Sequence, residues 1–444
     1  MSLAVRCCAA VLLAAAAPLA QAQWSPQWIG VWQHPETFHA ANVQRLRVGD
    51  DGATFAAVDV THHSRSHAAL VRFEADGTFA WLREHEALGA AAIERLPGGR
   101  VALVATSTTV GAMIDVRVYD GMTGDLAWSR ASNAARLNFD ERYETRNLDI
   151  DANGNLFIAA SDGADFVVLR YAANGDALPT WRHDVGESDV TATAIVALPD
   201  GGAIISGQGD NLGGGYRTVR FDASGAVLFD DAESGDIGNP LGPSWLAPTP
   251  DGGFLVAAAP ESTFGVPEAT VWKLAADGTR MWTTVLPNQN APMSFELRGL
   301  AVTLEGDALV VPESVLNLGF RLVRVRGTDG VVMREAQAAI GGHATTFALA
   351  PNGRALIGGY VFASSSGTVT ARIAEFDANG APCRTAASLA MMSPIASIGA
   401  DGGWTVGGAS AFVQGVGSDA LVRRYDAEGA CTDAIFDDGF EGGR

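Results

Sequence analysis

A repeat with a period of about 50 residues runs through nearly the whole chain and limits what it can fold into. Each repeat holds two different strand–turn–strand segments in succession. The clearest copy spans Asn147–Asp184, where Asn153–Gly154 supplies the residues that a tight hairpin turn needs. Each repeat is therefore expected to form one small antiparallel sheet. Because this sheet is apolar on both faces, neighbouring repeats have to cover it.

Two hairpin types alternate along the chain. The first joins an apolar strand to a strand of small apolar residues and occurs as LRVGDDGATFAAV, ERLPGGRVALVA, LDIDANGNLFIAA, VALPDGGAIISG, APTPDGGFLVAA, AVTLEGDALVVP, ALAPNGRALIGG and ASIGADGGWTVGG. The second occurs as LVRFEADGTFAW, VRVYDGMTGDLAW, VLRYAANGDALPTW, TVRFDASGAVLF, VWKLAADGTRMW, LVRVRGTDGVVM, IAEFDANGAPC and VRRYDAEGAC. Eight copies of each, with four strands per repeat, predict an all-β, eight-bladed β-propeller of four-stranded antiparallel blades.

Two alternatives to this fold stay open at this stage. Seven blades with one displaced copy would also fit, because the final strand of the eighth repeat is irregular. A parallel β-helix fits less well, since its coils are shorter and do not alternate two hairpin types.

The N-terminal segment Trp28–His34, WIGVWQH, resembles the last strand of a blade, as in FAWLREH at Phe79–His85. A closed ring removes the exposed sheet edges that an open array would leave. We therefore expect this segment to pair into the eighth blade and tie the two ends of the chain together.

The first 22 residues have the pattern of a secretory signal peptide. Arg6 gives the positive start, an Ala- and Leu-rich stretch the apolar core, and Ala20-Gln21-Ala22 the cleavage site, so cleavage is expected after Ala22. The expected organisation is a signal peptide at 1–22, a propeller domain at 23–430 and a C-terminal tail at 431–444. No later segment has the length and apolarity of a transmembrane anchor, so we expect a secreted or periplasmic protein.

Composition narrows the partners. The chain has 50 acidic and 30 basic residues and a formal charge of -20, which would repel nucleic acid. A glycan or a protein remains as the expected kind of ligand, and we expect the protein to be a monomer.

Aromatic residues recur at one position of the second hairpin. Trp81, Trp128 and Trp282 each lie four residues after the turn glycine, Phe229 occupies the same place, and Trp181 is shifted by an inserted Leu-Pro. Large rings at a repeated position favour packing of one blade on the next, and a sugar-stacking platform is the alternative.

A long cation recurs just before an aromatic or apolar residue of the same hairpin, at Arg72, Arg170, Arg220, Lys273 and Arg424. Lys273 is the only lysine of the chain, so this position favours a cation on a long stem. We expect each to reach a carboxylate between blades. Glu375 departs from the pattern.

These motifs resemble known bacterial repeats. The segments DFVVLRYAANG (Asp165–Gly175) and SDALVRRYDAEG (Ser418–Gly429) look like the delta-60 and related β-propeller repeats, and DIDANGNLFIAAS is similar to half of the SBBP repeat. The resemblance implies a secreted propeller without shared catalytic residues. A weaker likeness connects Tyr119–Trp128, YDGMTGDLAW, with the tryptophan-docking repeat of quinoprotein propellers.

The loops between the two hairpin types, and those between blades, are expected to lie on the face opposite the glycine turns and to carry any ligand site. One of them, THHSRSH, contains His62, His63 and His67. His63 and His67 are candidate ligands of a divalent metal, although no carboxylate lies close by in the sequence. A solvated polar loop is the alternative.

A second metal candidate is Asp149, Asp151, Asn153 and Asn155, whose spacing matches the opening of a calcium loop. An EF-hand is excluded because its closing glutamate would fall at Ala160. Either a simpler calcium loop or an ordinary turn explains the motif. The sequence predicts no cofactor and leaves calcium open.

No catalytic residues are predicted. The chain has no Gly-x-Ser-x-Gly, no His-Glu-x-x-His and no glycine-rich phosphate loop between a strand and a helix. A non-catalytic binding or surface-interaction scaffold is therefore favoured. The alternative is an enzyme on a propeller, either a carbohydrate-active hydrolase or lyase or a quinoprotein-like enzyme, because the many acidic residues leave a catalytic carboxylate pair open.

Only Cys383 and Cys431 remain after removal of the signal peptide, and two cysteines in an oxidising compartment suggest a disulfide. Equivalent points on neighbouring blades are too far apart for such a bond. We expect the bond only if the last segment leaves the eighth blade and frees that place for the N-terminal strand.

Overall fold

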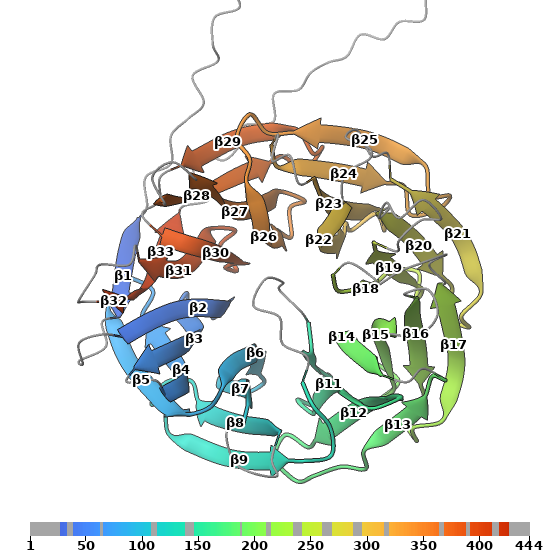
Figure 1. Ribbon diagram of the computed structural model, residues 1–444, viewed down its shortest axis with the longest axis horizontal. Coiled ribbons are helices and arrows are strands. Elements are labelled where there is room, and N and C mark those ends of the chain that lie inside the picture. Colours follow the sequence, from blue (N-terminus) through green and yellow to red (C-terminus); the bar gives the residue numbers. More distant parts are fainter. Residues whose placement is uncertain are drawn as a thin grey trace, which may run out of the picture.

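A computed structural model describes residues 27–32, 39–62, 65–107, 113–137, 146–186, 189–209, 215–233, 242–259, 269–286, 295–314, 319–363, 368–387, 391–410 and 417–425. Within these ranges the strands form eight sheets arranged as the blades of one closed ring, as predicted (Figure 1). The signal peptide at 1–22 and the tail at 431–444 lie outside the described residues, so those boundaries stay predictions.

Each blade has four antiparallel strands, which lie side by side in order from the ring axis to its rim (Figure 1). The innermost strands are β2 (His39–Val48), β6 (Gly89–Leu96), β10 (Leu148–Ile150), β14 (Val190–Ala197), β18 (Trp245–Pro248), β22 (Phe295–Val302), β26 (His343–Leu349) and β30 (Met391–Ile398). The second strands are β3 (Thr54–His62), β7 (Arg100–Thr106), β11 (Leu156–Asp162), β15 (Ala203–Gly209), β19 (Phe254–Ala258), β23 (Ala308–Ser314), β27 (Ala355–Ala363) and β31 (Trp404–Ser410).

The two remaining positions complete each blade. The third strands are β4 (Arg65–Phe73), β8 (Ile114–Asp120), β12 (Asp165–Tyr171), β16 (Tyr216–Phe221), β20 (Thr270–Leu274), β24 (Arg321–Val325), β28 (Thr368–Phe376) and β33 (Ala420–Tyr425). The outermost are β5 (Phe79–Glu86), β9 (Leu126–Ser132), β13 (Trp181–Asp184), β17 (Val227–Glu233), β21 (Arg280–Val285), β25 (Val332–Gln337), β29 (Pro382–Ala387) and β1 (Trp28–Trp32).

The predicted clasp is confirmed. Strand β1 takes the outermost place of the eighth blade and pairs antiparallel with β33, so blue β1 lies beside orange-red β33 (Figure 1). A short strand, β32 (Gly417–Ser418), also leaves the eighth blade and pairs in parallel with β2 of the first. The ring is thus closed by two separate strand pairings.

Apolar side chains fill the space between neighbouring blades. In the described part of the chain, each of the eight hydrophobic clusters draws its residues from two adjacent blades, and the cluster that joins the eighth blade to the first includes Trp32, Val60, Phe73 and Val422. This explains why successive residues of β19, and of β11 before its last residue, are buried rather than alternating between buried and exposed. The core of the protein is therefore a ring of interfaces between blades.

The recurrent aromatic residues of the first five blades pack their own blade on the next, as the sequence predicted. A Cβ atom added to Gly225 would come within 2.2 Å of the Trp181 ring, and one added to Gly175 within 2.7 Å of Trp128. The glycines have φ of 90° at both positions, a backbone conformation that other residues adopt at a cost. The turn glycine therefore serves two purposes, because it permits the turn and leaves room for the ring of the preceding blade.

The recurrent cations correct one detail of the prediction. Lys273 Nζ lies 2.5 Å from a carboxylate oxygen of Asp251, which belongs to the same blade, and 3.0 Å from the carbonyl oxygen of Gly327 in the next blade. Arg72 likewise contacts Asp51 in its own blade and the Gly121 carbonyl in the following one. The cation thus joins two blades through a carbonyl group, and the carboxylate balances its charge within one blade.

Candidate functional site

A cavity of 780 Å³ lies on the ring axis, lined in the described part of the chain by the innermost strands of seven blades. Most of the lining residues come from the ends of these strands that lead into the glycine turns, or from the turns themselves. This end is opposite to the loop-bearing face on which the sequence had led us to expect a ligand site. The innermost strands of different blades converge on the axis and together line the cavity. The sequence of one repeat therefore does not predict it.

One wall of this cavity is charged. Arg47 Nε donates to a carboxylate oxygen of Glu94 at 2.9 Å, and Arg95 Nη2 lies 2.9 Å from a carboxylate oxygen of Asp50. The first and second blades thus each supply an arginine and a carboxylate to the two ion pairs between them. Asp149 of the third blade continues the wall. Burial raises the pKa of Asp149 above its ordinary value, against the opposing effect of a hydrogen bond from the Ala197 amide.

The remaining wall is mainly apolar, with contributions from Leu246, Pro248, Phe347, Leu349 and Ile398 of the fifth, seventh and eighth blades. The cavity therefore offers charged and apolar surface to one bound molecule. That combination suits a ligand that has both characters.

The candidate calcium residues do not act as one group. Asp149 lies in the cavity wall, whereas Asp151 uses its carboxylate to hold the turn, accepting hydrogen bonds from the amides of Asn153 at 2.8 Å and Asn155 at 2.9 Å. Asp51 and Asp200 make the same kind of turn contact in other blades, at Ala53 and Gly202. The geometry thus matches the ordinary turn that was the alternative, and calcium binding here stays a prediction.

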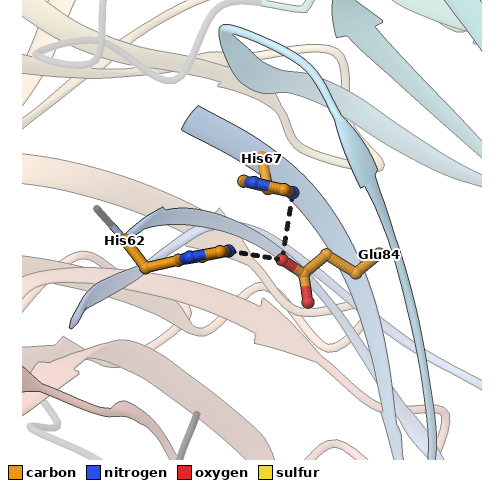
Figure 2. Close-up of side chains that lie close together, drawn as sticks. All are labelled: His62, His67 and Glu84. Atoms are coloured by element: carbon orange, nitrogen blue, oxygen red, sulfur yellow. Dashed lines mark ion pairs between the residues drawn. The ribbon is translucent and has the colours of Figure 1, made fainter. Parts of the chain in front are cut away.

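Histidine and carboxylate groups gather at the other end of the first blade (Figure 2). His62 lies at the end of β3, His67 near the start of β4 and Glu84 on β5. His67 Nδ1 is 3.1 Å and His62 Nε2 is 3.7 Å from the same oxygen, Glu84 Oε1. The two imidazole rings are stacked, with centroids 4.5 Å apart, and all three side chains are partly buried.

Strand register explains why these three residues meet. In the hairpin of β3 and β4, Val60 lies opposite His67 and His62 opposite Arg65, so both histidines project from one face of the sheet. Ala69 lies opposite Glu84 in the next pairing, which puts the carboxylate on that face too. The cluster therefore spans three adjacent strands, and His62 belongs to the last residue pair of the β3–β4 hairpin.

This arrangement revises the histidine prediction. His63 lies outside the described residues, and the structure brings His62 rather than a residue at helical spacing next to His67. No carboxylate lies close to these histidines in the sequence, but Glu84 lies close to them in space. The alternation of a β-hairpin could have paired His62 with His67, but only knowledge of the third strand's register could have added Glu84.

The cysteine prediction is tested only in part. Cys383 is disulfide-bonded, while Cys431 lies outside the described residues. The condition set for the bond is met, since β1 occupies the outermost place of the eighth blade. The pairing of Cys383 with Cys431 stays a prediction.

Comparison with known proteins identifies the fold and no family. No family model and no curated protein matches the chain. Among solved structures it is similar to the Dos1 propeller, at 13% identity and a TM-score of 0.55 over 90% of this chain and 96% of that one. It is also similar to quinohemoprotein alcohol dehydrogenase from Comamonas testosteroni, at 11% identity and a TM-score of 0.52 over 89% and 76%. At such identities the likeness establishes a β-propeller and nothing about activity, so membership of the delta-60 or SBBP repeat families remains a resemblance.

In the described part of the chain, no helix has the length and apolar character needed to cross a membrane.

Proposed function

We propose that this protein is a secreted, non-catalytic binding scaffold that holds a peptide segment of a protein partner in the axial cavity. The cavity is the observation that carries this proposal, because residues from seven blades converge on it. Its volume of 780 Å³ is in the range of pockets that bind small organic ligands or short segments.

The chemistry of the cavity supports a peptide. Arg47, Glu94, Arg95 and Asp50 give the wall both signs of charge, which match the amine, carboxylate and amide groups of a peptide. The apolar wall around Phe347 and Leu349 suits a hydrophobic side chain. Secretion is supported by the N-terminal sequence and by the disulfide bond of Cys383, since such bonds persist in oxidising compartments. A closed ring without open edges between blades fits a monomer.

The test is selection from a random-peptide display library with purified protein and two matched variants. Ser397→Trp puts a bulky ring into the cavity wall, while Ser129→Trp puts the same ring on the exposed outer strand β9. Peptides enriched by the natural protein should bind the Ser397→Trp variant at least about tenfold more weakly and the Ser129→Trp variant equally well.

Equal binding by both variants would contradict the proposal and place the ligand elsewhere. A glycan array read out with product analysis gives a second arm. Cleavage of any glycan would favour the enzyme alternative over a binding scaffold.

A further inference from the structure

The side chains of His62, His67 and Glu84 form a cluster outside the axial cavity (Figure 2). Their ligand atoms all lie within 4.8 Å of one another. From this geometry we infer that the cluster is a binding site for a divalent transition metal, with Zn²⁺ as the favoured ion. The inference goes beyond the proposed function, because the cluster lies at the opposite end of the blade from the cavity.

The distances suit tetrahedral zinc. Zinc binds imidazole nitrogen and carboxylate oxygen at about 2.0–2.2 Å, which puts two ligand atoms of a tetrahedron about 3.4 Å apart. The distances of His67 Nδ1 and His62 Nε2 from Glu84 Oε1 are 3.1 Å and 3.7 Å, on either side of that value. Small movements of the side chains would therefore admit the ion between them.

The donor set decides which metals fit. Two imidazoles and one carboxylate are ligands that zinc, copper and nickel accept, whereas magnesium and calcium prefer sites made only of oxygen. Two histidines and a glutamate leave a fourth tetrahedral position for water, as in zinc sites that remain open. His62, His67 and Glu84 are exposed by 16%, 14% and 22% of their side-chain surface, so the cluster can be reached from solvent.

The surrounding charges permit a cation. Arg65 is a basic side chain on this face, opposite His62 in the hairpin, and its guanidinium turns toward Glu86 at 3.3 Å. Arg65 is 72% exposed, so water screens its charge. The formal charge of the chain, -20, also favours binding of a cation.

The rigid frame of the blade supports the site. Val60 and Ala69, which flank the cluster on β3 and β4, are fully buried in the interface between the first and eighth blades. Ligands on paired strands keep their relative positions better than ligands on a loop. Folding of the blade therefore already accounts for most of the entropy loss that ordering these ligands would otherwise add to metal binding.

The experiment is a zinc titration of the tag-free, chelator-treated, full-length folded protein by calorimetry. The natural protein should bind one Zn²⁺ per chain at His62, His67 and Glu84, with its thermal unfolding midpoint rising by a few degrees in excess zinc. His62→Gln, His67→Gln and Glu84→Gln should each weaken binding at least about tenfold. Magnesium should not compete.

His183→Gln is the matched control, because His183 also lies beside a carboxylate, Asp230 at 3.0 Å, but belongs to no group of three metal-ligating side chains in the described ranges. This variant should keep full zinc affinity. Circular dichroism and the unfolding midpoint of each variant without metal establish that it is folded.

Three results would overturn the inference. They are failure of the natural protein to bind zinc, unchanged affinity in the folded His62, His67 and Glu84 variants, or loss of binding in a His63→Gln variant while His62→Gln binds normally. In the last case the original pairing of His63 with His67 would be the better description. Cobalt substitution adds a spectroscopic readout, since tetrahedral Co²⁺ absorbs visible light far more strongly than octahedral Co²⁺.

Discussion

At the scale of single residues, the turn glycines carry more information than their conformation alone. Gly225 has φ of 90° and lies against the Trp181 ring, whereas Gly252 has φ of 82° and nothing within 4 Å of where its Cβ atom would be. Both are strained by substitution, but only Gly225 also contacts the preceding blade. The pair therefore separates the cost of the turn from the cost of the contact between blades.

We predict that Gly225→Ala lowers the free energy of unfolding by about 2–4 kcal/mol, and Gly252→Ala by only about 1–2 kcal/mol. The excess measures the clash of a new methyl group with Trp181. Urea unfolding followed by tryptophan fluorescence and circular dichroism gives both values. Equal losses for the two variants would mean that the ring can move aside and does not lock the blades together.

The role of a residue was predictable where the same residue type recurs at the same position of several repeats. Trp81 and Trp128 could be assigned to packing between blades because the same position recurs, and a role that recurs is structural. Glu84 could not be assigned, because it occurs once and its partners lie on two other strands. Asp149 was singled out for its spacing, yet its place in the cavity wall depends on the curvature of the whole ring.

At the scale of the blade, the seventh blade reverses the charge of the recurrent ion pair. Glu375 replaces the cation and is fully buried between Arg354 and Arg384, each 2.6 Å from one of its oxygens. Trp404 of the eighth blade also donates to it at 2.9 Å. Glu375, which departs from the recurrent cation, thus still makes a charged contact between blades, with two buried arginines around its carboxylate.

Removal of this carboxylate should be costly, because it leaves buried guanidinium groups without their counter-charge. We predict that Glu375→Ala lowers the free energy of unfolding by about 3–5 kcal/mol. The control Asp162→Ala, which breaks the exposed Arg182–Asp162 pair, should cost less than about 1 kcal/mol. Chemical denaturation of both variants checks this, and a small loss for Glu375→Ala would show that water reaches the pair.

At the scale of the whole molecule, the sequence predicted more of the fold than of the site. Repeat number and strand alternation determine how many blades form and which faces they bury, and both were read correctly. The cavity and the His62–His67–Glu84 cluster depend on distances between strands that no local pattern contains. The face expected to carry a ligand was inferred from the position of the loops alone, whereas convergence of the innermost strands puts the cavity at the other end.

Closure of the ring is the claim on which the cavity and the proposed function rest, and a cross-link between its ends tests it most directly. Ile29 on β1 lies opposite Arg423 on β33, and residues paired in this way have Cα atoms about 4.5–5.5 Å apart, within reach of a disulfide. The control pairs Ile29→Cys with Arg424→Cys, whose side chain projects from the other face. Mass spectrometry of peptides from the oxidised, folded protein should find the Ile29→Cys/Arg423→Cys link within one chain and little of the control link. Absence of the first link, or equal yields of both, would contradict a ring closed by its N-terminal strand.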